Sequence, residues 1–118
     1  MFIAESLFGE QELAYRKRVY FAYGDNGQIK IGLTGRPNGH RGGEMHFLEL
    51  CSVPGDRLTE HQYHAKYAAE RISKTEWFSA SDRLLLDILT LCAQQQRHKS
   101  VEILKEIIGS RLRQAVAA

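Results

Sequence analysis

Cysteine is scarce in this sequence, and long apolar runs are missing. The only two cysteines among 118 residues, Cys51 and Cys92, form no CxxC pair. This spacing gives no support to a zinc ribbon or a thioredoxin-like redox centre, and it predicts two buried free thiols. No apolar stretch approaches the roughly 20 residues of a membrane-spanning helix, and the acidic Glu5 near the start is atypical of a signal peptide. We therefore expect a soluble, cytoplasmic protein with no membrane partner.

An excess of charge of one sign is also missing. Sixteen basic and fourteen acidic residues leave a net charge of +2, which permits a nucleic-acid partner without requiring one. Any basic face must come from local clusters, such as Arg16–Arg18 or the group Arg36, His40 and Arg41. A short basic run can equally be an ordinary solvated surface. The length suits one domain, and a hydrophobic content of 43% suffices for one core.

A β-hairpin is the strongest local signal. Val19–Tyr23 is rich in β-branched and aromatic residues, Gly24–Gly27 has the composition of a tight turn, and Gln28–Leu33 resumes strand character. Phe47–Val53 predicts a third, buried strand. The residues Ser73–Phe78 are expected to be a connector.

The remaining segments predict helices. Short helices are expected at Ser6–Tyr15 and around Asn38–Met45, and longer ones from Pro54–Asp56 to about Ile72, over Ser79–Gln95 and over Ser100–Ala115. Three strands followed by helices indicate an α+β domain: a small three-stranded antiparallel sheet flanked by helices, with additional C-terminal helices.

The helix after Pro54 carries polar residues at helical spacing. Glu60, His64, Tyr67 and Arg71 fall on one face, while an apolar face is predicted from Leu58, Ala65, Ala68, Ala69 and Ile72. One carboxylate suits Mg²⁺, whereas two ligands without a cysteine are too few for zinc. A solvated helix surface is the ordinary alternative for an isolated Glu-xxx-His pair.

Tyr20 and Lys30 lie on the two strands of the hairpin, where they can face the same side of the sheet. With Arg41 and a distant Glu60 they form a coherent set for phosphoryl transfer, in which charge on a phosphate must be neutralised. Taken singly, Tyr20 and Lys30 are ordinary strand residues.

The ordered series of short motifs resembles the GIY-YIG nuclease superfamily, in particular its phage and bacterial branch. The matching segments are Arg18-Val19-Tyr20, Lys30-Ile31-Gly32, Glu60–His64 and Glu76-Trp77-Phe78. The resemblance covers about residues 18–80. It divides the chain into an N-terminal extension (1–17), a nuclease-like core (18–80) and a C-terminal helical extension (81–118).

The resemblance implies an endonuclease that hydrolyses DNA phosphodiester bonds with Mg²⁺ or Mn²⁺. By position, Tyr20 would activate a water, Arg41 would hold the phosphate, and Glu60 would bind the metal. Lys30 stands where the family has its second tyrosine and is expected to lower the pKa of Tyr20 by its charge. His64 would support the site, and Gly32 would let the backbone turn tightly beside it.

Several alternatives stay open. Arg18 replaces the first glycine of the motif. Arg36 and His40 compete with Arg41 for the phosphate, and all four residues are candidates for nucleic-acid contact. The chain could instead be an inactive nucleic-acid-binding domain of the same fold, or a protein-interaction module that uses its C-terminal helices. Exposed apolar stripes on those helices would favour a homodimer, whereas a last helix that folds back would complete a monomer.

Overall fold

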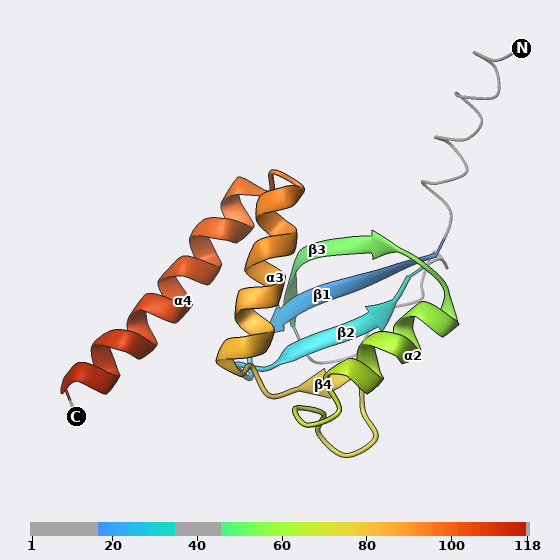
Figure 1. Cartoon of the computed structure of the whole chain (residues 1–118), viewed down its shortest axis with the longest axis horizontal. Helices are drawn as coiled ribbons and strands as arrows, with labels where there is room; N and C mark the ends of the chain where they lie inside the picture. Colours follow the sequence, from blue (N-terminus) through green and yellow to red (C-terminus); the bar gives the residue numbers. More distant parts are fainter. Residues whose placement is uncertain (1–16, 35–45, 118) are drawn as a thin grey trace, which may run out of the picture.

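An antiparallel sheet and three helices make up the part of the chain that this computed structural model describes, residues 17–34 and 46–117. The strands lie side by side, with α3 across one face of the sheet and α2 beside β2 (Figure 1). This arrangement confirms the predicted α+β class. The short helices predicted at 6–15 and 38–45 lie outside the described residues.

The predicted hairpin is present. β1 (Arg18–Gly24) pairs antiparallel with β2 (Ile29–Leu33). In the turn, Gly27 adopts a φ of +78°, which a residue without a Cβ tolerates, and the Asn26 side chain accepts a 3.0 Å hydrogen bond from the Gln28 amide. Turn chemistry and strand propensity therefore agree locally, which is why the sequence signal was strong.

The sheet has four strands rather than the predicted three. The strand order is β3-β1-β2-β4, in which β3 spans Phe47–Pro54 and β4 is the two-residue strand Trp77–Phe78. The segment Ser73–Phe78 was predicted to be a connector, and that prediction is wrong at its end, since Trp77 and Phe78 pair with β2. Two residues are too few to show a strand periodicity, so only the pairing partner reveals the strand.

A β-bulge shapes the pairing of β1 with β3. Phe21 lies opposite Cys51 and Ala22 opposite Glu49, which leaves Leu50 as the extra residue. The Leu50 side chain is fully buried, and its carbonyl accepts a 2.7 Å hydrogen bond from the Ser100 hydroxyl. The bulge therefore provides the acceptor that ties the last helix to the sheet.

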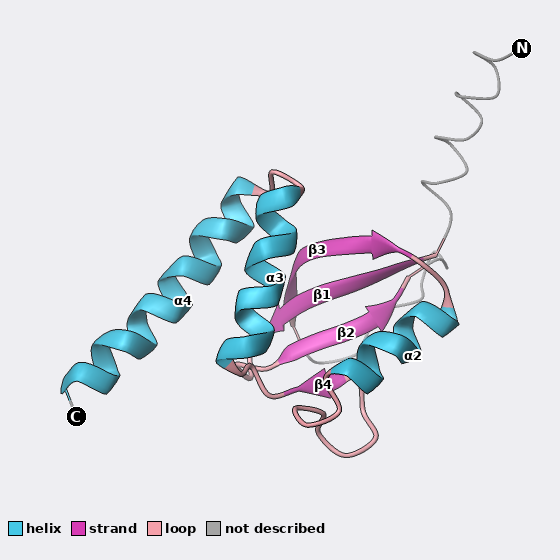
Figure 2. Ribbon diagram, in the orientation of Figure 1, coloured by secondary structure: helices cyan, strands magenta, loops and turns pink. Residues whose placement is uncertain are grey.

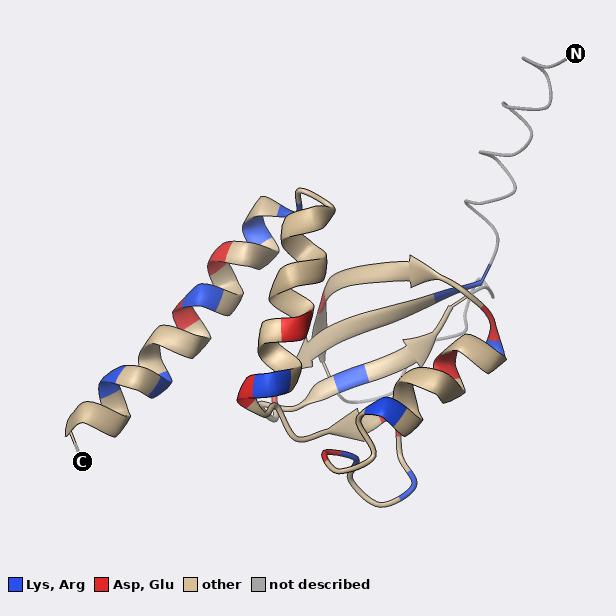
Figure 3. Ribbon diagram, viewed as in Figure 1, with Lys and Arg blue, Asp and Glu red and all other residues tan. Residues whose placement is uncertain are grey.

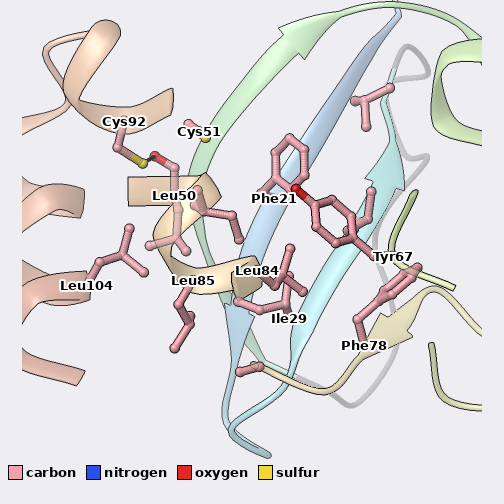
Figure 4. Close-up of a cluster of buried hydrophobic side chains, with 14 residues drawn as sticks. Phe21, Ile29, Leu50, Cys51, Tyr67, Phe78, Leu84, Leu85, Cys92 and Leu104 are labelled. Atoms are coloured by element: carbon pink, nitrogen blue, oxygen red, sulfur yellow. Dashed lines mark hydrogen bonds between the residues drawn. The ribbon is translucent and has the colours of Figure 1, made fainter. Parts of the chain in front are cut away.

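The core lies between the sheet and α3 (Asp82–Gln94). Ser81 caps this helix by accepting from the Leu84 amide. Of the apolar positions predicted for it, Leu84, Leu85, Ile88 and Cys92 are buried and Leu91 is partly buried. Figure 4 shows Leu84, Leu85 and Cys92 in one cluster with Phe21 and Leu50 of the sheet. Cys51 and Cys92 are free buried thiols, as predicted.

The last helix, α4 (His98–Ala117), packs antiparallel to α3 and then extends beyond it (Figure 2). Leu104 is fully buried, and Arg111 forms a 3.1 Å ion pair with Asp82 at the start of α3. Because α4 has 20 residues and α3 has 13, the end of α4 has no neighbour on α3. Leu112 and Val116 are accordingly 63% and 86% exposed.

α2 (Arg57–Lys66) is shorter than predicted, since it was expected to reach Ile72. Asp56 caps its start by accepting from the amides of Leu58 and Thr59. The helix ends at Tyr67 because this side chain turns into the core, where its hydroxyl donates a 2.6 Å hydrogen bond to Asp87. Tyr67 therefore does not share the polar face of α2.

The predicted apolar face of α2 is also wrong. Leu58 is 65% exposed, and Ala65, Ala68 and Ala69 are exposed as well. The buried residues of α2 are Glu60 and His64. The amphipathic interpretation assumed that the polar face meets solvent, whereas this helix turns it toward the protein.

None of the helices in residues 17–34 and 46–117 has the length and apolar character needed to cross a membrane.

Candidate active site

A cleft of about 680 Å³ opens between β2, α2 and the segment that leads into β4. Four of the residues predicted for the site line it together: Tyr20, Lys30, Glu60 and His64. Further cations line the same cleft, namely Lys17, Arg57, Arg71 and Lys74. Figure 3 shows the Lys and Arg positions on β2, at the ends of α2 and on the loop after it. The cleft therefore combines carboxylates with a basic rim.

The hairpin register places Tyr20 and Lys30 on the same face. Tyr20 lies opposite Gly32 and Ala22 opposite Lys30, and residues two apart on a strand share a face. The Tyr20 ring lies across Gly32, because a Cβ at position 32 would be 2.7 Å from the phenol oxygen. Gly32 was expected to allow a tight turn, but it lies within β2 and provides room for this ring.

Aromatic rings and a carboxylate fix the Lys30 ammonium. Its Nζ lies 4.8 Å from the centroid of the Phe47 ring and 5.7 Å from that of Trp77. It is also 4.0 Å from Glu76 Oε1, and the Lys30 side chain is 14% exposed. The Phe47 ring in turn stacks on Tyr20, with the centroids 5.8 Å apart. Lys30 thus keeps its position beside Tyr20 by cation–π attraction and charge.

The electrostatic setting of Tyr20 differs from the expectation. Burial, followed by the charges of Glu76, Glu49 and Glu60, raises the pKa of Tyr20 above its ordinary value. Lys30 was expected to lower this pKa, whereas burial and the three carboxylates together raise it; the effect of Lys30 itself stays a prediction. All three carboxylates come from elements distant from Tyr20 in sequence: Glu49 from β3, Glu60 from α2, and Glu76 from the segment before β4.

Glu60 is the buried carboxylate of the cleft. Its side chain is 9% exposed, and Oε2 is buried with no hydrogen-bond partner among the described residues. A buried carboxylate oxygen without a donor is costly unless a cation or another ligand offsets its charge. The donor set fits Mg²⁺ or Mn²⁺, since such ions take one or two carboxylates and keep several waters.

His64 holds α2 against the sheet. Its Nε2 is 3.0 Å from the Ile31 carbonyl oxygen, which can only accept, so Nε2 carries the proton. The same Nε2 is 3.8 Å from Glu60 Oε2, which is too long for a hydrogen bond. His64 therefore positions the helix turn that carries Glu60, and its role in the candidate site stays a prediction.

Glu76, the first residue of the Glu-Trp-Phe segment, also lines the cleft, although the sequence assigned no role to it. Its backbone carbonyl accepts a 3.0 Å hydrogen bond from the Ile31 amide. Burial raises the pKa of Glu76, and the neighbouring Glu60 raises it further. The Glu-Trp-Phe segment was the available signal, but the fold alone shows that Glu76 lies beside Glu60.

The predicted phosphate-binding residues are described only in part. Arg36, His40 and Arg41 lie outside the described residues. Arg18 donates from Nε to the Ser52 hydroxyl at 2.8 Å and from Nη2 to the Ser52 carbonyl at 3.2 Å. These hydrogen bonds join β1 to β3. Arg18 is not among the described residues that line the cleft.

No group of three or more His, Cys, Asp or Glu side chains in the described residues is arranged to hold a metal ion. Comparisons with protein-family models, curated proteins and solved structures give no significant match.

Proposed function

We propose that this chain is a GIY-YIG-type endonuclease that hydrolyses DNA phosphodiester bonds in the cleft between β2 and α2, with Mg²⁺ or Mn²⁺ as cofactor. The supporting observation is that Tyr20, Lys30 and Glu60 line one cleft, although Glu60 comes from a helix that follows both strands. A phenol, an ammonium and a buried carboxylate are the groups that the resemblance assigns to this chemistry.

The charge distribution supports a phosphate substrate. Lys17 precedes β1, Arg57 begins α2, and Arg71 and Lys74 lie on the segment between α2 and β4, so these cations can contact successive phosphates of a nucleic-acid backbone. Such contacts fix the position of the strand without reading its sequence. A chain with a net charge of only +2 thus concentrates cations where a polyanion would enter.

Glu60, Lys30 and Tyr20 have different roles in this proposal. Glu60 would hold the cation, which when bound stabilises negative charge on the leaving oxygen. Lys30 places its ammonium beside Tyr20 and offsets charge on the phosphate. Tyr20 orients a water through its phenol oxygen, and it can accept a proton only when positive charge offsets the surrounding carboxylates.

The test is cleavage by the purified protein. Single-stranded, duplex and branched DNA are incubated with Mg²⁺, with Mn²⁺ or with a chelator. Glu60→Gln should abolish metal-dependent cleavage but keep DNA binding, because phosphate contacts come from basic residues. Tyr20→Phe and Lys30→Met should each lower the rate by roughly 100- to 10,000-fold.

Matched controls are available on the same strands. Glu49→Gln removes a carboxylate outside the cleft, and Tyr23→Phe removes a hydroxyl from the opposite face of β1. Tyr23→Phe should cleave like the parent, and Glu49→Gln should cleave at least as fast, because it removes one of the charges that raise the pKa of Tyr20. DNA binding without cleavage on any substrate would favour the alternative of an inactive nucleic-acid-binding domain. An undiminished rate in Glu60→Gln would overturn the assignment of the site.

A further inference from the structure

We propose that Glu76 is the second protein ligand of the divalent cation held by Glu60, so that the cleft binds the ion through two carboxylates. This inference rests on the proposed function, because it concerns the same site. It extends that proposal by assigning a role to a residue for which the sequence gave none.

The backbone of one residue brings the two carboxylates together. The Ile31 amide donates to the Glu76 carbonyl at 3.0 Å, and the Ile31 carbonyl accepts from His64 Nε2 at 3.0 Å. His64 lies one helical turn after Glu60, so both carboxylate-bearing segments are fixed to the same point of β2. Both polar groups of an edge residue are thereby used to set the spacing of Glu60 and Glu76.

Glu60 has a buried carboxylate oxygen whose charge a bound cation would offset. Its Oε2 is buried and has no hydrogen-bond partner among the described residues, and Glu60 lines the cleft together with Glu76. Glu60 and Glu76 line the same cleft, and two ionised carboxylates placed in one cleft repel each other. A divalent cation between them would convert that repulsion into attraction.

Lys30 offsets only part of this negative charge. Its ammonium is 4.0 Å from Glu76 Oε1, beyond hydrogen-bond length, and it lies against Phe47 and Trp77. Glu76 is about half exposed, so its carboxylate is accessible to a hydrated ion from the cleft. Two carboxylates, remaining waters and a substrate phosphate match the ligand set that Mg²⁺ prefers.

Metal affinity can be measured without any nucleic acid. Binding of Mn²⁺ to the full chain is followed by titration calorimetry and by the loss of the free-ion paramagnetic resonance signal. The parent should bind one ion, and Glu60→Gln should bind none. Glu76→Gln should weaken binding by at least about tenfold, because even residues that only orient a ligand are worth that much.

Two variants separate a ligand from a counter-ion. Glu49→Gln makes the same change in charge at a carboxylate outside the cleft and should keep the parent affinity. Lys30→Met removes the ammonium partner of Glu76 and should bind Mn²⁺ as tightly as the parent or more tightly. Thermal unfolding of each variant without metal confirms that it is folded.

The inference is overturned if Glu76→Gln binds Mn²⁺ as tightly as Glu49→Gln, or if the parent binds no ion. This outcome is independent of the proposed function. Loss of affinity in Glu76→Gln without cleavage of any DNA would support the cation site and reject the nuclease. DNA cleavage by the parent, together with unchanged Mn²⁺ affinity in Glu76→Gln, would support the nuclease and reject Glu76 as a ligand.

Discussion

His64 Nε2 and the Ile31 carbonyl oxygen are 3.0 Å apart, across 33 positions of sequence. The contact joins α2 to β2 beyond the short β4, where the edge of β2 would otherwise be open. It also fixes the helix turn that carries Glu60. A single hydrogen bond thus connects the stability of the sheet edge to the geometry of the candidate site.

Replacing His64 by alanine should therefore lower the free energy of unfolding. The Ile31 carbonyl would lose its donor in a buried setting, at a cost of about 1–3 kcal/mol. Urea denaturation followed by circular dichroism measures the change. His61 is exposed on the same helix, and His61→Ala should leave the free energy of unfolding nearly unchanged. Equal losses in the two variants would show that the contact contributes nothing.

Gly32 should not tolerate a side chain. A Cβ at this position would be 2.7 Å from the Tyr20 ring, so Gly32→Ala should displace the ring and cost about 1–3 kcal/mol of stability. DNA cleavage should fall as well, because Tyr20 moves. At Gly109 in α4 the nearest atom would be 3.5 Å away, and Gly109→Ala should stabilise the protein by about 1 kcal/mol. Full activity in Gly32→Ala would contradict the assigned packing.

The ion pair between the buried Glu70 and the exposed Arg83 should make stability depend on pH. Hydrogen bonds from Arg83 lower the pKa of Glu70, and Ser81 donates to the same carboxylate at 2.7 Å. Because the folded pKa is depressed, this stabilisation is present above the unfolded value and is lost as the pH falls through the folded value.

At pH 7, Glu70→Gln should lower the free energy of unfolding by about 1–3 kcal/mol. The difference from the parent should shrink below roughly pH 4, where the unfolded carboxyl becomes protonated. Urea titrations at pH 7 and pH 3 test both statements. Glu106, whose partner Arg113 is exposed, provides the control: Glu106→Gln should change stability by less than about 0.5 kcal/mol. A pH-independent difference for Glu70→Gln would refute the linkage.

A homodimer through the end of α4 stays a prediction. Leu112 and Val116 are exposed where α4 extends beyond α3, and an apolar stripe can meet its own copy about a two-fold axis. Light scattering at micromolar concentration should give the mass of two chains for the parent and of one chain for Leu112→Glu.

Leu58 is similarly exposed but lies on α2, so Leu58→Glu should keep the dimer mass. Removal of all residues after Ser100 is unsuitable as a test, because Leu104 belongs to the core. A parent mass of one chain would end the dimer prediction. The end of α4 would then be free for a different protein partner, as the interaction-module alternative requires.

The sequence by itself determined the features that depend on short-range chemistry. The hairpin follows from strand propensity around an Asn-Gly turn, and α3 follows from its Ser81 cap and its apolar spacing. The shared face of Tyr20 and Lys30 follows from the two-residue period of strands. Each of these rests on residues that are neighbours along the chain or across one turn.

Only the tertiary structure decided the features that depend on distant partners. β4 forms because Trp77 and Phe78 pair with Lys30 and Ile29 of β2. α2 ends where the Tyr67 side chain turns inward and its hydroxyl donates to Asp87. α2 buries Glu60, on the polar face, and exposes the face that amphipathicity predicted to be buried. A hydrogen bond to the Ile31 amide holds Glu76 at the same cleft. Such contacts carry no local signal, because their free energy arises from groups that meet only after the chain has folded.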